Sequence, residues 1–131
     1  MDLDTRTTAL VLGRTRAVIG LILVFLPGLA AWLWFGESTP RTRALLRMVG
    51  VRDLILGVGV LTTVKEQTQD AEWVGMGAVA DAVDGVVTLT SPGIPLRGRL
   101  AGPVVLGASV LGIKLARELA DARVAPIPNP E

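Results

Sequence analysis

Residues 44–64 read ALLRMVGVRDLILGVGVLTTV, an apolar run with an adjacent arginine and aspartate, Arg52 and Asp53, near its centre. At about 1.5 Å per residue, a helix of this length can cross the hydrocarbon core of a bilayer. A charge at the centre of such a helix costs about 2.5–3.5 kcal/mol on insertion scales, so it is retained for pairing or for function. The fold class therefore depends on whether this run is a membrane helix.

Three further apolar runs, residues 17–35, 73–90 and 100–119, are separated from it by turn signals and charged segments. In the first, Pro27 is expected to bend the helix and not to end it, because lipid favours retained helix. Short connections between four such runs predict an antiparallel bundle. We therefore predict an all-α integral membrane four-helix bundle, with one domain over residues 1–124 and a solvated proline-rich tail over residues 125–131.

The composition supports the membrane class, since 50% of the residues are hydrophobic and only 19% are charged. A soluble four-helix bundle is the main alternative, and it needs a polar stripe along each helix. Residues 19–26 and 102–113 contain no charged side chain and offer no such stripe. A cleavable signal peptide is a second reading of the first run, but that run is long for one and three more follow.

The chain has no histidine and no cysteine. These absences remove the usual general base, the conventional nucleophile triad and the thiolate metal site. The net charge of +1 does not indicate nucleic-acid binding, and no glycine motif for nucleotides is present. We expect no metal and no cofactor, and a non-enzymatic protein is favoured over an enzyme.

Helical rise and periodicity place the charges of the second and third runs. Asp53 and Asp81 fall near the midplane, while Arg52 and Asp84 lie about 3–4 Å to its outer side and are level with each other. Arg52 with Asp84 is therefore the predicted ion pair, in the bidentate geometry that guanidinium favours. Because Asp81 and Asp84 are three residues apart, they share a helix face that must look into protein or water.

The fifth charge within the runs is Lys114, close enough to the inner end of its helix to extend toward the interface. Counted together, the five charges sum to minus one. One of Asp53 and Asp81 is therefore expected to carry a proton. The charges can either fix helix register, which is the favoured reading, or form a path for protons or a ligand.

Basic residues between the runs and near their ends indicate topology. With the N-terminus in the cytoplasm, seven basic residues lie on or toward that side and five on the other, a bias that favours cytoplasmic N- and C-termini. The five are Arg41, Arg43, Arg47, Arg97 and Arg99, and the seven are Arg6, Arg14, Arg16, Lys65, Lys114, Arg117 and Arg123. Arg47 and its neighbours can contact lipid phosphates, although anchoring the helix end explains them equally well.

Two resemblances to families follow from these motifs. Gly50-Val51-Arg52-Asp53-Leu54-Ile55-Leu56-Gly57, with Asp84-Gly85 about thirty residues later, is similar to small four-helix membrane proteins of actinobacteria without an assigned activity. That resemblance implies the architecture and the importance of the charged residues. Asp81-Ala82-Val83-Asp84-Gly85 resembles the opening DxxDG of CDP-alcohol phosphatidyltransferases, which hold a divalent metal, but that family's later aspartates are missing here.

The leading expectation is a non-enzymatic membrane component, either an accessory subunit or a self-associating bundle, held together by the polar cluster of the second and third runs. A small proton-coupled carrier or a lipid-binding protein that uses Asp53, Asp81 and Asp84 is the alternative, and a metal-dependent membrane transferase ranks third. The expected partners are the lipid bilayer of the cell membrane and either further copies of the chain or a larger membrane complex.

Overall fold

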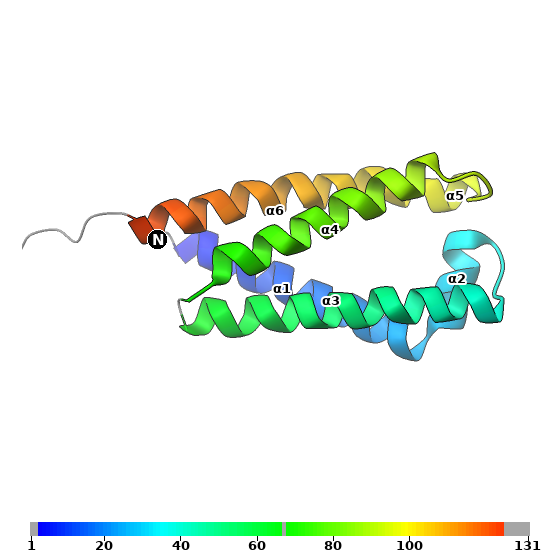
Figure 1. Cartoon of the computed structure of the whole chain (residues 1–131), viewed down its shortest axis with the longest axis horizontal. Helices are drawn as coiled ribbons and strands as arrows, with labels where there is room; N and C mark the ends of the chain where they lie inside the picture. Colours follow the sequence, from blue (N-terminus) through cyan, green and yellow to red (C-terminus); the bar gives the residue numbers. More distant parts are fainter. Residues whose placement is uncertain (1–2, 67, 125–131) are drawn as a thin grey trace, which may run out of the picture.

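A computed structural model describes residues 3–66 and 68–124, and every regular element in those residues is a helix. The long helices are α1 (Leu3–Phe25), α3 (Pro40–Glu66), α4 (Asp70–Thr90) and α6 (Ala101–Val124), and the short ones are α2 (Pro27–Phe35) and α5 (Leu96–Arg99). Successive long helices run antiparallel, so the described chain starts and ends at the same end of the molecule (Figure 1). The all-α prediction is confirmed. The proposed tail, residues 125–131, lies outside the described residues.

The start of the first helix was predicted wrongly. The structure begins α1 at Leu3 instead of residue 17, and it ends α1 at Phe25. Pro27 then occupies the first position of α2, after Leu26 leaves the helical conformation with φ −120° and ψ 44°. Pro27 therefore ends one helix and starts another instead of bending a single one, because it has no amide hydrogen to continue the hydrogen-bond ladder and its fixed φ suits a helix start.

The long helices form two tight pairs, α1 with α3 and α4 with α6, and the contact between the pairs is much smaller (Figure 1). Glycines set the distance within the first pair. A Cβ atom added at Gly20 would lie 2.7 Å from the carbonyl oxygen of Gly50, and one added at Gly57 would lie 2.7 Å from that of Gly13. The backbones of α1 and α3 therefore touch at two places, in the manner of small-residue contacts between membrane helices.

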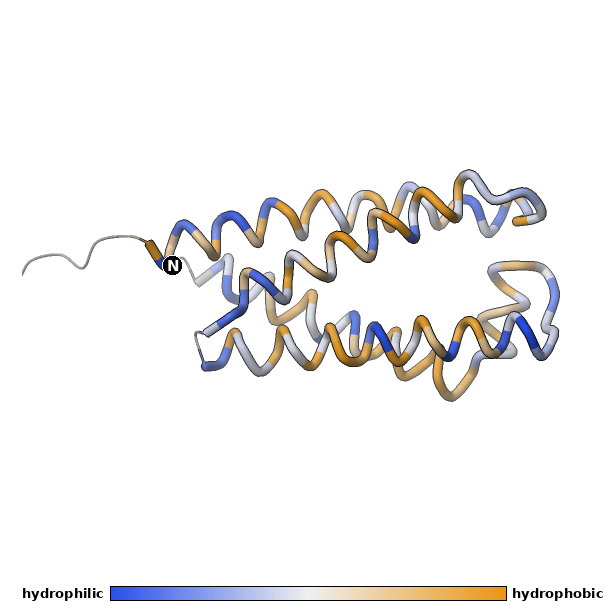
Figure 2. Tube along the Cα trace, in the orientation of Figure 1, coloured by the Kyte–Doolittle hydropathy of each residue, from blue (hydrophilic) through white to orange (hydrophobic). Residues whose placement is uncertain are grey.

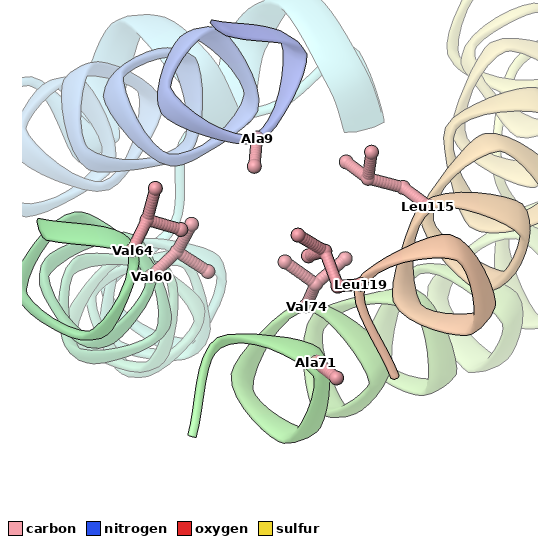
Figure 3. Close-up of a cluster of buried hydrophobic side chains, with 7 residues drawn as sticks. All are labelled: Ala9, Val60, Val64, Ala71, Val74, Leu115 and Leu119. Carbon is pink, nitrogen blue, oxygen red and sulfur yellow. The ribbon is translucent and has the colours of Figure 1, made fainter. Parts of the chain in front are cut away.

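Within the described residues, the two pairs share a buried apolar core near the α3–α4 connection. There, Ala9 of α1, Val60 and Val64 of α3, Val74 of α4 and Leu119 of α6 point toward one another (Figure 3). The other buried apolar cluster joins Leu23, Ala31 and Leu46, which belong to α1, α2 and α3 alone. The α1/α3 and α4/α6 pairs thus pack together at one end, while contact between α2 and α5 bridges them at the other end.

Among the described residues, three helical stretches are long and apolar enough to cross a membrane: Asp4–Phe25, Asp70–Thr90 and Leu96–Val124. The prediction of four such helices is therefore supported for three. The α3 helix does not meet the same standard, because hydrophilic residues recur along its length (Figure 2). Large apolar side chains nevertheless cover the outside of the bundle, including Phe25 and Val104, which are 74% and 73% exposed.

Candidate functional site

The predicted ion pair between Arg52 on α3 and Asp84 on α4 is present. Arg52 donates from Nη1 to Oδ1 of Asp84 at 3.0 Å and from Nη2 to Oδ2 at 2.5 Å, which is the expected bidentate geometry. The two side chains are 34% and 23% exposed. Helical rise predicted that the two residues are level with each other, and they pair because the faces that carry them meet where α3 and α4 approach each other.

Arg16 joins the cluster from α1, and its predicted position in the basic flank before the first run was wrong. Its Nη1 donates to Oδ1 of Asp53 at 3.2 Å, and its Nη2 donates to Oδ2 of Asp81 and to the carbonyl oxygen of Gly77 at 3.3 Å. The Arg16 side chain is only 8% exposed. An arginine buried this deeply needs such partners, because an unpaired charge in a low-dielectric interior is very costly.

The apolar residues before Arg16 were the signal that could have placed it. Residues 9–13 read ALVLG, so apolar sequence lies on both sides of Arg16. A helix that includes both segments puts Arg16 near its middle, as α1 does, and only the choice of residue 17 as the helix start hid this. The extension of α1 toward its N-terminus thus accounts for the missed residue.

Together the five side chains form a chain of alternating charge. Asp81 contacts Arg16, Arg16 contacts Asp53, Asp53 contacts Arg52, and Arg52 contacts Asp84. Asp53 is shared, since its Oδ1 also accepts a hydrogen bond from Nη2 of Arg52 at 3.1 Å. We call this set the Arg/Asp network. It begins and ends on α4 and passes through α1 and α3, so it connects the two helix pairs.

Arg47 and Lys114 lie apart from the network. Arg47 donates from Nε to the carbonyl oxygen of Val24 at 3.4 Å, and so serves one of the last carbonyls of α1. The Lys114 side chain is 75% exposed and lies 3.8 Å from the carboxylate of Glu118, one helical turn away. Neither residue therefore contributes charge to the network, and Arg16 takes the place that Lys114 held in the predicted charge balance.

A cavity of about 340 Å³ lies between the helix pairs, beside the Arg/Asp network. Its charged lining residues are Arg16, Asp53, Asp81 and Asp84, and the remaining walls are largely apolar. Trp34 of α2 also lines it, and the indole Nε1 of Trp34 is buried without a hydrogen-bond partner among the described residues. The site thus combines paired charges with an apolar wall.

The arrangement of carboxylates does not resemble a metal centre. Within residues 3–66 and 68–124, no three acidic side chains are grouped so that they could hold a metal ion. Asp81 and Asp84, the aspartates of the DxxDG motif, each accept from a guanidinium group instead. Chemically, the network can hold helices in register and can offer charge to a molecule in the adjacent cavity.

Compared with protein-family models, curated proteins and solved structures, the chain matches none. The resemblances noted in the sequence therefore stay predictions.

Proposed function

We propose that this chain is a non-enzymatic integral membrane protein of the cell membrane, an accessory subunit or a self-associating bundle, in which the Arg/Asp network holds the helices in register. The observation that carries the proposal is that each of Asp53, Asp81 and Asp84 is paired with a guanidinium group, and that the pairs connect α1, α3 and α4. In a soluble protein the polar groups lie outside and the apolar groups inside. This bundle has charged groups inside and apolar side chains outside, which is the arrangement expected of a protein surrounded by lipid.

In this proposal α3 crosses the membrane together with the other long helices. It packs along α1 throughout, and its outward residues Met48, Val51, Ile55 and Val58 are 48–70% exposed and all apolar. Arg52 and Asp53 face the network instead, so these two charges near the middle of α3 are paired with opposite charges. Four crossings also account for the two described ends of the chain lying at the same end of the bundle (Figure 1).

A double-mutant cycle tests the structural role. Arg52→Ala and Asp84→Ala should each lower the stability of the purified protein in non-ionic detergent, and the double variant should lose less than the sum of the two. We expect a coupling energy of about 1–3 kcal/mol, as found for charged pairs in direct contact. The losses arise because each single variant leaves an uncompensated charge in the interior.

Lys114 and Glu118 provide the matched control, because they form an exposed pair one turn apart on α6. Such surface pairs couple by only about 0.3–0.5 kcal/mol. Equal coupling energies for the two cycles would contradict a structural role for the network. Coupling that is clearly larger between Arg52 and Asp84 supports it.

Ligand binding is the second candidate function, as a small carrier or a lipid-binding protein, and the cavity beside the aspartates favours it. A purely structural network would be sealed by apolar side chains, whereas three of these carboxylates line an accessible space. The geometry does not favour a phosphatidyltransferase-like function, because both aspartates of the DxxDG motif form ion pairs with arginines.

A further inference from the structure

The cavity between the helix pairs has the size and the lining of a small-molecule site. Its volume of about 340 Å³ falls within the range of ligand pockets, about 300–1,000 Å³. Apolar residues of α6, namely Ala101, Val104, Val105 and Ala108, form part of its wall. Because Val104 lines the cavity and is also largely exposed, the cavity opens to the outer surface of the bundle beside α6.

The charge beside this cavity is not balanced. The Arg/Asp network contains two guanidinium groups and three carboxylates, so its formal charge is minus one when all of them are ionised. Within the described residues, α2 and α6 contribute no ionisable side chain to the lining, so nothing from those helices compensates. A single positive charge in the cavity would neutralise the network, and in a low-dielectric site such an interaction is strong.

The remaining lining favours an organic molecule over a small metal ion. Most of the cavity surface is apolar and would be matched by a hydrocarbon or aromatic body. Metal ions such as Mg²⁺ instead require several oxygen ligands, and here the carboxylates are held by arginines.

We infer that this cavity binds an organic cation with one positive charge and an apolar body, placed so that the charge lies against the carboxylates of the Arg/Asp network. The inference rests on the second function proposed above and specifies its ligand class. A bound proton would neutralise the same network, so the cation and the proton compete for one site. The opening beside α6 gives the cation a route from the bilayer.

Calorimetric titration with two matched probes tests this inference. Benzyltrimethylammonium carries one positive charge, and neopentylbenzene has the same shape with carbon in place of nitrogen. With the whole chain in non-ionic detergent, and protein-free micelles as the reference, we expect the cation to bind at least about tenfold more tightly than its neutral isostere. Equal affinity for the two probes would overturn the inference, because the cavity would then select only for shape.

Two variants locate the binding. Asp81→Asn makes the network formally neutral, so this variant should bind the cation and its neutral isostere with about equal affinity. Ala108→Phe fills the cavity from α6 without altering any charge and should weaken binding of both probes by about tenfold or more. Val110→Phe is the matched control, since Val110 lies on the same helix, is 69% exposed and does not line the cavity. Unchanged cation binding in the Ala108→Phe variant would also overturn the inference, even if Asp81→Asn does not fold.

The outcome is separable from that of the structural proposal. If the Arg52–Asp84 coupling is large and the cation shows no preference, the network is structural and the inference about a cation is wrong. If the cation is preferred and the coupling is no larger than that of Lys114 with Glu118, the network acts mainly in binding and the structural proposal fails.

Discussion

The guanidinium of Arg16 lies 3.2 Å from the carboxylate of Asp53, and this pair, with 8% and 12% of the two side chains exposed, joins the middle of α1 to the middle of α3. The same guanidinium also reaches Asp81 of α4. One arginine of α1 therefore contacts two other helices, α3 and α4, from inside the bundle. Its position explains how a chain with an apolar exterior can retain five charges in its interior.

Replacing Arg16 should destabilise the protein more than replacing any exposed arginine. Arg16→Ala leaves Asp53 and Asp81 without a shared counter-charge, and removing one partner of a buried pair costs about 3–5 kcal/mol. Arg14→Ala is the control, because Arg14 is exposed on the same helix, and such changes usually stay within about 0.5 kcal/mol. Unfolding in non-ionic detergent measures both. Similar stabilities for the two variants would show that Arg16 is not buried in this way.

Alanine substitutions should have opposite effects on stability at a glycine in the close contact between α1 and α3 and at a glycine of α6 that faces open space. In Gly20→Ala the new methyl group would lie 2.7 Å from backbone atoms of Gly50 and Leu54, so the helices must move apart, at a cost of about 1–3 kcal/mol. In Gly107→Ala the methyl group meets no atom within 4 Å, so the better helix propensity of alanine should stabilise by up to about 1 kcal/mol. Thermal unfolding of both variants in detergent tests this, and a loss of equal size in each would contradict the described packing.

Cysteine labelling tests whether α3 crosses the membrane, and the natural absence of cysteine makes each introduced thiol unique. Glu37 lies just before the start of α3, and Glu66 is the last residue of α3. Both residues are exposed. In intact cells an impermeant thiol reagent should label Glu37→Cys and should label Glu66→Cys only after permeabilisation, because we propose cytoplasmic termini. Labelling of both residues from one side would mean that α3 does not cross, and the reverse pattern would invert the orientation.

The basic residues bear on the orientation of the helices in the membrane. With Arg16 inside the bundle, six basic residues stay on the proposed cytoplasmic side against five on the other, so the positive-inside bias is small. The labelling pattern of Glu37→Cys and Glu66→Cys decides the matter directly.

Rules that act within one helix explain which features of the site could be predicted. The level of Arg52 with Asp84 follows from helical rise alone, and the pair is present. Lys114 is exposed and pairs with Glu118, but α6 continues to Val124, so Lys114 does not lie near a helix end as predicted. The role of Arg16 was missed because the predicted helix started one residue after it. The break at Pro27 was missed because the expectation that lipid favours retained helix does not say where the segment after the proline packs.

The sequence by itself determined that the chain forms apolar helices separated by turns and that Arg52 and Asp84 lie level with each other along their helices. These properties depend on local composition and on the fixed rise and period of a helix. Only the tertiary structure decided that α1 pairs with α3 and α4 with α6, that Arg16 enters the network from a third helix, and that a cavity stays open beside the three aspartates. Lateral arrangement depends on how side chains of different helices fit together, as at Gly20 and Gly50, and no rule that acts along a single helix contains that information.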